Sequence, residues 1–149
     1  MKKIILVAAA IFSLTLLPNL QAGDSITKDD IQGTWKLVSA KYGDETEFSD
    51  FPKEQLKLKL ITDTHWLWIQ RPADDRHVQT LMGGTYSLKG NTYKESVAFI
   101  GQPTEGNQWL SDAIGAKNTF TIEVDGDKLH LYGELQSGMK IDEIWKRVK

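Results

Sequence analysis

The sequence predicts an all-β protein, an eight-stranded antiparallel up-and-down barrel that follows a short N-terminal helical turn. After residue 32 no stretch of eleven or more residues has helical periodicity, whereas runs with a period of two residues recur. Gly, Asn, Asp or Pro bounds each run, as expected of turns. Because no helix is predicted to cover a sheet, the strands protect their edges best by closing into a barrel. A two-sheet sandwich is the alternative.

Composition limits the classes of protein and partner. The 149 residues, of which 40% are hydrophobic and 26% charged, suit one globular domain. Eighteen Lys and Arg against twenty Asp and Glu leave a net charge of -2, so the chain has no basic surplus for nucleic acid. Since the chain has no Cys, disulfides, thiolate nucleophiles, Cys-ligated zinc and an N-terminal lipoprotein anchor are excluded.

The N-terminus has the pattern of a secretory signal peptide. Lys2 and Lys3 precede an apolar run over residues 4–17, and Ala22 suits the position before a cleavage site. A membrane anchor is the alternative, but the run is shorter than the roughly 20 residues that a spanning helix needs. We therefore expect a signal peptide over 1–22 and a barrel domain over 23–149. The mature protein should be periplasmic or secreted, without a membrane span.

The expected elements follow in order. Residues 24–32 can form one short helix, with Ser25 or Thr27 as its N-cap and acidic residues in its first turn. Eight strands follow, at 33–42, 56–62, 65–71, 77–88, 92–100, 118–125, 128–135 and 140–148. Two connections, 43–55 and 101–117, are longer than the others, and we expect them to border the open mouth of the barrel.

Alternation along the strands predicts which face is buried. In strand 56–62, Leu56, Leu58 and Leu60 alternate with Lys57 and Lys59, so the leucine face is expected inside. The same pattern in strand 118–125 buries Phe120, Ile122 and Val124.

Other strands have a mixed face, with aromatic residues beside single carboxylates. In strand 92–100, Glu95 shares its face with Tyr93, Val97 and Phe99. In strand 140–148, Glu143 shares its face with Ile141, Trp145 and Arg147. Such faces suit a partly polar cavity, and the alternative is an outer face with snorkelling groups. In strand 65–71, Trp66 and Trp68 should point inward and His65 outward, because two exposed indoles cost more than one exposed imidazole.

A motif in the first strand and an arginine in the last strand carry a first resemblance. Gly33-Thr34-Trp35 opens the first strand after the helical turn, and Arg147 lies in the last strand. This pairing resembles the signature of the lipocalins and calycins. The resemblance implies that Trp35 closes the barrel base, that Arg147 lies across its ring, and that Gly33 lets the chain pass close beneath the floor.

A closer resemblance covers most of the mature chain. Three segments resemble the short bacterial lipocalin-like domains of unknown function that are common in Bacteroidetes: Thr62-x-Thr64-His65-Trp66-x-Trp68, Gly83-Gly84-Thr85-Tyr86-Ser87-Leu88-x-Gly90-x-Thr92-Tyr93-x-Glu95 and Glu143-Ile144-Trp145-x-Arg147. The resemblance implies an exported calycin barrel with no assigned reaction. Removal of residues 1–22 from the 149 leaves 127, fewer than in the larger lipocalins, whose disulfides and C-terminal helix are also missing. Their ligands are therefore not carried over.

The expected function is the binding of a small apolar or amphipathic molecule inside the barrel. The family pattern places Tyr86 inside, and alternation adds the rest of the predicted ligand-binding set: Trp66, Trp68, Tyr93, Glu95 and Glu143. Two carboxylates without a certain basic partner argue against fatty acids, because burying like charges together is costly. A neutral or cationic amphiphile is the predicted ligand.

Enzyme and metal signatures are missing from the sequence. It has no Gly-x-Ser-x-Gly, no His-Glu-x-x-His and no glycine-rich phosphate loop, so no catalytic activity and no cofactor are expected. His65, His77 and His130 fall on strands that are not mutually adjacent, so no metal site is expected. Two alternatives stay open. One is an enzyme that uses Glu95, Glu143 and a Tyr; the other is a ligand-free interaction module that docks through Trp109 and Leu110 or through an apolar outer face.

Overall fold

The structure, a computed structural model, describes residues 25–101 and 113–149. Within these ranges it contains one short helix, α1 (Lys28–Ile31), and nine strands. The strands are β1 (Gly33–Tyr42), β2 (Ser49–Asp50), β3 (Gln55–Ile61), β4 (His65–Pro72), β5 (Thr80–Lys89), β6 (Thr92–Gly101), β7 (Lys117–Asp125), β8 (Lys128–Glu134) and β9 (Lys140–Arg147). In the described part of the chain no helix is long and apolar enough to cross a membrane.

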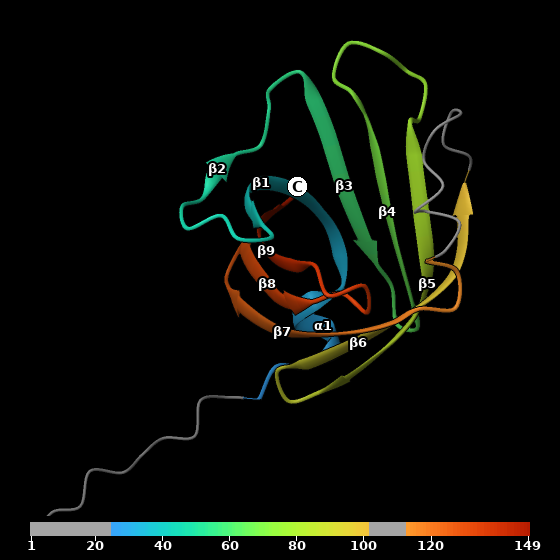
Figure 1. The fold of residues 1–149 in the computed structure, drawn as a ribbon. Coiled ribbons are helices and arrows are strands. Elements are labelled where there is room, and N and C mark those ends of the chain that lie inside the picture. The colour runs from blue at the N-terminus through green and yellow to red at the C-terminus, as the bar shows by residue number, and fades with distance from the viewer. Residues whose placement is uncertain (1–24, 102–112) are drawn as a thin grey trace, which may run out of the picture.

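Eight of the strands close into an antiparallel barrel in which each strand pairs with its neighbour in sequence. The order runs from β1 through β3 to β9, and β9 pairs back with β1 (Figure 1). The two-residue β2, which the sequence did not predict, adds to the edge of β1 at Ser39 and Ala40. The predicted fold class is therefore confirmed, including the helical turn, where the Thr27 amide donates to the Asp30 carboxylate over 2.8 Å.

The two ends of the barrel differ in what connects the strands. Because neighbouring strands are antiparallel, successive connections lie at alternate ends. Helix α1 and the tight turns before β4, β6 and β8 lie at one end, which we call the α1 end. The connection 43–54 and those before β5 and β9 lie at the other, which we call the far end. The predicted loop 101–117 joins strands at the far end, but residues 102–112, with Trp109 and Leu110, lie outside the described residues, as does the predicted signal peptide.

The interior toward the α1 end is filled with apolar side chains. Phe120 and Ile122 point inward as predicted, with exposed fractions of 3% and 0%. The other large side chains that are fully buried come from α1 and from β1, β4, β6, β8 and β9: Ile31, Trp35, Leu37, Trp66, Tyr93, Leu129, Leu131 and Trp145. This half is therefore a packed core.

Strand β3 contradicts the predicted burial. Lys59 is 3% exposed and Lys57 half-buried, and both point into the barrel, whereas Leu58 and Leu60 lie on the outer face. The pairing shows why, because Leu60 lies opposite Leu67 and Leu58 opposite Ile69, on the side of β4 away from Trp66. The leucines are themselves half-buried by these outer neighbours. The apolar faces of β3 and β4 pack side by side on the outer surface of the barrel. The prediction from alternation that the leucine face of β3 is buried inside was therefore wrong.

A β-bulge explains a second difference. Gly84 pairs with Val97 and Gly83 with Phe99, so β6 has one extra residue, Ala98, at this point. The extra residue reverses the alternation, and Phe99 is 46% exposed instead of sharing the inner face of Val97. A side chain on Gly83 would collide with the Phe99 ring, with a Cβ 2.6 Å from Cζ.

Candidate functional site

At the α1 end, Trp35 and Arg147 form a plug across the barrel. The Trp35 indole donates to the Ile31 carbonyl over 2.8 Å, and the Arg147 guanidinium carbon lies 4.1 Å from the centre of the Trp35 ring. Arg147 also donates to the carbonyls of Gln32 over 2.6 Å and Asp30 over 2.7 Å. The cation thus ties β9 to both β1 and the end of α1.

Gly33 is required by this plug. Its φ of +128° is a backbone conformation that residues with a side chain rarely adopt. A Cβ at this position would lie 2.8 Å from Nη1 of Arg147. A larger residue would therefore displace the guanidinium from its place over the Trp35 ring.

Halfway along the barrel, two buried ion pairs cross the interior. In the first, which we call the deep pair, Lys59 Nζ lies 2.5 Å from Glu95 Oε1, and both side chains are about 95% buried, with 4% and 5% exposed. In the second, the far pair, Lys57 Nζ lies 2.9 Å from Glu143 Oε1, with side chains 13% and 6% exposed. Lys57 precedes Lys59 on β3, so the far pair is nearer the far end and retains some contact with solvent.

Aromatic rings surround both ammonium groups. Lys57 Nζ lies 5.0 Å from the ring centre of Trp68, 5.6 Å from that of Trp145 and 5.8 Å from that of Tyr42. Lys59 Nζ lies 5.3 Å from the Trp66 ring and 5.4 Å from the Tyr93 ring. These distances are typical of cation–π interactions, which are most favourable where the charge is shielded from water.

Glu143 is held by three donors. Lys57 and the Tyr42 hydroxyl donate to Oε1 over 2.9 Å and 2.8 Å, and the Trp145 indole donates to Oε2 over 3.2 Å. Burial alone raises the pKa of this carboxyl, but the charges of Lys57 and Lys59 and these hydrogen bonds outweigh it, so the pKa lies below its ordinary value. Glu143 is therefore an anion in the folded protein at neutral pH.

Two tyrosine hydroxyls near the pairs are kept protonated. Burial, and then the charge of Glu143, raise the pKa of Tyr42 far above its usual range. Burial, and then the charge of Glu95, raise the pKa of Tyr93 in the same direction. The Tyr93 hydroxyl is fully buried and has no hydrogen-bond partner among the described residues. Each ion pair therefore has a neutral tyrosine hydroxyl nearby, Tyr42 beside the far pair and Tyr93 beside the deep pair.

The structure brings all six predicted ligand-binding residues into the barrel. Trp68 and Glu143 belong to the far pair and its surroundings, and Glu95, Trp66 and Tyr93 belong to the deep pair. Tyr86 lies closer to the α1 end, where its hydroxyl donates to the Thr62 carbonyl over 2.7 Å. Which of the six contact a ligand stays a prediction.

Three residues of the site, Lys57, Lys59 and Tyr42, were not among those predicted from the sequence. A signal for the lysines was present, because two inward-facing acids that come from β6 and β9 need cationic partners inside the same barrel. Each acid has one, so the argument that unpartnered carboxylates disfavour anions and admit cations is wrong. The four charged groups of the two pairs sum to zero.

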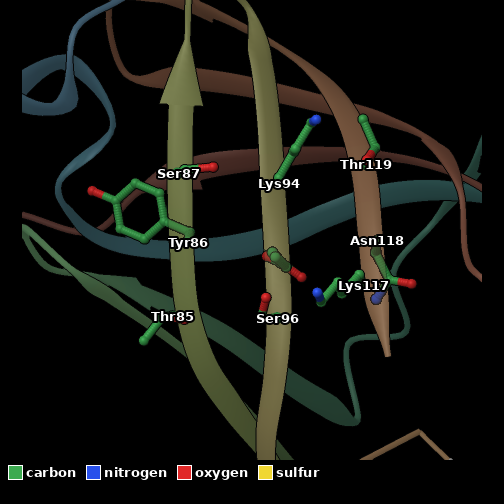
Figure 2. A pocket seen from close by; sticks show the side chains of 9 residues that line it. Thr85, Tyr86, Ser87, Lys94, Ser96, Lys117, Asn118 and Thr119 are labelled. Atoms are coloured by element: carbon green, nitrogen blue, oxygen red, sulfur yellow. The ribbon is translucent and has the colours of Figure 1, made fainter. Parts of the chain in front are cut away.

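A pocket of about 250 Å³ lies across β5, β6 and β7. Its lining is mostly hydroxyl groups and lysines: Thr85, Tyr86, Ser87, Lys94, Glu95, Ser96, Lys117, Asn118 and Thr119. Figure 2 shows Tyr86 and Ser87 on opposite sides of β5. Five of these nine residues are exposed, whereas Tyr86, Glu95 and Asn118 are buried, so the pocket shares Tyr86 and Glu95 with the barrel interior.

The three histidines lie in different environments on the surface of the protein. His65 and His77 are exposed, and His130 lies on the outside of β8, 2.6 Å from the Asp142 carboxylate. Among the described residues, no three His, Cys, Asp or Glu side chains lie close enough together to hold a metal ion.

Comparison with known proteins identifies the fold. No family model matches the sequence, and no curated protein matches it. Two solved structures do. A lipocalin-like protein from Bacteroides uniformis is 21% identical, with a TM-score of 0.54, over 80% of this chain and 99% of that one. An uncharacterised protein from Bacteroides eggerthii is 15% identical, with a TM-score of 0.52, over 78% of this chain and 98% of that one. The chain has the lipocalin-like fold, as the resemblance in its sequence implied.

Proposed function

We propose that this protein is exported and binds one small amphipathic molecule inside its barrel, in the half between the ion pairs and the far end. The observation that carries the proposal is the far pair itself. Lys57 is a charged group ringed by Tyr42, Trp68 and Trp145, yet its side chain keeps 13% of its exposure. An apolar wall with a few polar groups that face one point is the usual form of a ligand site.

The energetics of the pairs support a function for them. Taking two charges out of water costs several kcal/mol for each ion, and a well-packed apolar pair in the same place is often at least as stable. The apolar packing beside the Arg147–Trp35 plug shows that this chain can fill part of its barrel with apolar side chains. The lysines and acids are therefore better explained by a bound molecule than by stability.

The location is part of the proposal. The N-terminal pattern favours export to the periplasm or beyond, with a mature chain that begins near Gly23. N-terminal sequencing of protein from the native host should give a start near this residue, and a retained Met1 would contradict export.

Isothermal titration calorimetry tests the binding. The ligands are dodecanol, dodecanoate and dodecylammonium, each below the concentration at which it aggregates. We expect saturable binding of at least one of them with one site per chain. Trp68→Ala should weaken it about tenfold or more, because a large part of the apolar wall is lost. The matched control is Leu67→Ala, a neighbour on the outer face, which should bind as the parent does. No saturable binding, or equal losses in both variants, would contradict the proposal.

One observation favours a second candidate, an interaction module. The outer face of β3 to β6 is apolar, with Leu58, Leu60, Leu67, Ile69, Leu81 and Phe99 on neighbouring strands. Most of these side chains are half-buried, and Phe99 is 46% exposed. A partner that binds there would be insensitive to Lys57 and sensitive to Phe99→Ser. The catalytic alternative needs a carboxyl with a raised pKa, whereas the pKa of Glu143 is lowered.

A further inference from the structure

The polar groups around the far pair define what kind of molecule can occupy it. A lysine ammonium has three N–H donors and no acceptor. Among the described residues, Lys57 donates to Glu143 alone. Two N–H donors of a largely buried ammonium thus have no hydrogen-bond partner among these residues; the Lys57 side chain is 13% exposed, and the centre of the Trp68 ring lies 5.0 Å from Nζ.

The Glu143 carboxylate, the charged acceptor beside Lys57, is largely occupied. Glu143 receives hydrogen bonds from Lys57, Tyr42 and Trp145, which use most of the acceptor capacity of a carboxylate. The Tyr42 hydroxyl donates its hydrogen bond to Glu143, and its raised pKa keeps the hydroxyl protonated at neutral pH. The far pair therefore presents donors to an incoming molecule, and its complement is an acceptor.

Charge narrows the choice. Lys57 and Lys59 are balanced by Glu143 and Glu95, so the layer is neutral without a ligand. A carboxylate ligand would compete with Glu143 for Lys57 and leave a net negative charge in a low-dielectric interior. An ammonium ligand would lie beside Lys57, whose like charge repels it.

Shape gives the last constraint. The centres of three aromatic rings, from β1, β4 and β9, lie between 5.0 and 5.8 Å from Lys57 Nζ. Flat rings favour a flat ligand body that stacks in offset or edge-on contact.

From these observations we infer that the barrel takes an uncharged carbonyl compound with a flat apolar body, whose oxygen accepts hydrogen bonds from Lys57. This rests on the proposed function, because it names the ligand class of the same site. Lys57 is the specificity-determining residue, and Trp68 and Tyr42 form the wall. Glu143 positions Lys57 and keeps the site electrically neutral.

The experiment uses four naphthalenes that share one ring system and differ at position 2: the methyl ketone, the ethyl compound, the carboxylate and the aminomethyl compound, which is cationic at neutral pH. Each is titrated into the mature protein by calorimetry at pH 7. We expect the ketone to bind about tenfold more tightly than the other three, since it alone is uncharged and offers an acceptor.

Two variants locate the effect. Lys57→Met should abolish the advantage of the ketone over the ethyl compound while leaving binding of the ethyl compound within about threefold. Lys36→Met, on the exposed face of β1, is the matched control and should change nothing. Because Lys57→Met leaves Glu143 without its cation, Lys57→Met combined with Glu143→Gln is measured too, and the same loss of preference is expected.

The outcomes separate the two claims. Binding of the carboxylate or the amine as tightly as the ketone, or a ketone preference that survives in both Lys57 variants, would overturn the inference and leave the proposed function standing. Saturable binding by none of the four naphthalenes overturns the inference, and when the dodecyl ligands fail as well, the proposed function falls with it.

Discussion

The α1 end and the ion-pair layer place cations beside aromatic rings in opposite ways. At the α1 end, Arg147 lies over Trp35, its side chain is 26% exposed, and it donates hydrogen bonds to the backbone carbonyls of Gln32 and Asp30. In the layer, Lys59 is 4% exposed and depends on one carboxylate, Glu95. The first arrangement joins chain ends with a cation that remains partly hydrated. The second holds charges inside the protein, where each depends on its partner.

The difference indicates a separate role for each cation. A guanidinium over an indole at the barrel floor strengthens closure at little desolvation cost. A buried ammonium–carboxylate pair is weak evidence for stability, because desolvation consumes most of its Coulomb energy. We therefore expect the Arg147–Trp35 plug to stabilise the fold. Removing one partner of a buried ion pair should lower the free energy of unfolding strongly, whereas replacing both partners with apolar residues should change it little.

The largest effect is expected in the deep pair. Lys59→Met keeps the length of the side chain but leaves Glu95 buried without its cation, so the free energy of unfolding should fall by about 3–5 kcal/mol. Urea unfolding followed by circular dichroism measures it. Adding Glu95→Leu to the same chain should restore most of the loss. A single variant as stable as the parent would mean that water reaches Glu95.

The plug should show a smaller effect. Arg147→Ala removes the cation over Trp35 and two hydrogen bonds to carbonyls, and should cost about 1–3 kcal/mol of unfolding free energy. The matched control is Lys146→Ala, the exposed neighbour on β9. An unchanged urea midpoint in Arg147→Ala would show that this residue contributes nothing to closure.

The pH dependence of stability tests the far pair, with an effect of at most about 1.4 kcal/mol per pH unit for one group. The folded pKa of Glu143 lies below its ordinary value of 4.5, so the unfolded chain takes up the proton first as pH falls. Its contribution is present above pH 4.5 and is lost as pH falls through the folded pKa. Urea midpoints measured from pH 6 to 3 should therefore decline more steeply in the parent than in Glu143→Gln. Parallel declines would contradict the lowered pKa.

The sequence contained the fold almost completely but only part of the site. Turn residues and period-two runs placed all eight barrel strands, because local chemistry sets where a strand ends. The inward acids Glu95 and Glu143 were also predictable, because each shares a face with aromatic residues. The inward lysines were not, since the alternation of Leu58 with Lys59 is identical for either orientation of β3.

Only the neighbours of β3 decide its orientation. Trp66 occupies the inner face of β4, so Leu67 and Ile69 are left outside, where they pair with the leucines of β3. The bulge at Ala98 could not be predicted for the same reason. An extra residue in β6 is recognised only when its pairing with β5 is known.

Chemical modification of lysines can show directly whether Lys57 and Lys59 of β3 face the barrel interior in solution. The native protein is treated with formaldehyde and cyanoborohydride, digested, and mapped by mass spectrometry. Lys36 and Lys94 are exposed and should be dimethylated quickly, whereas Lys57 should react slowly and Lys59 should stay unmodified until urea unfolds the chain. Modification of Lys57 and Lys59 at the rate of Lys36 would place the leucine face inside and contradict the account of the site.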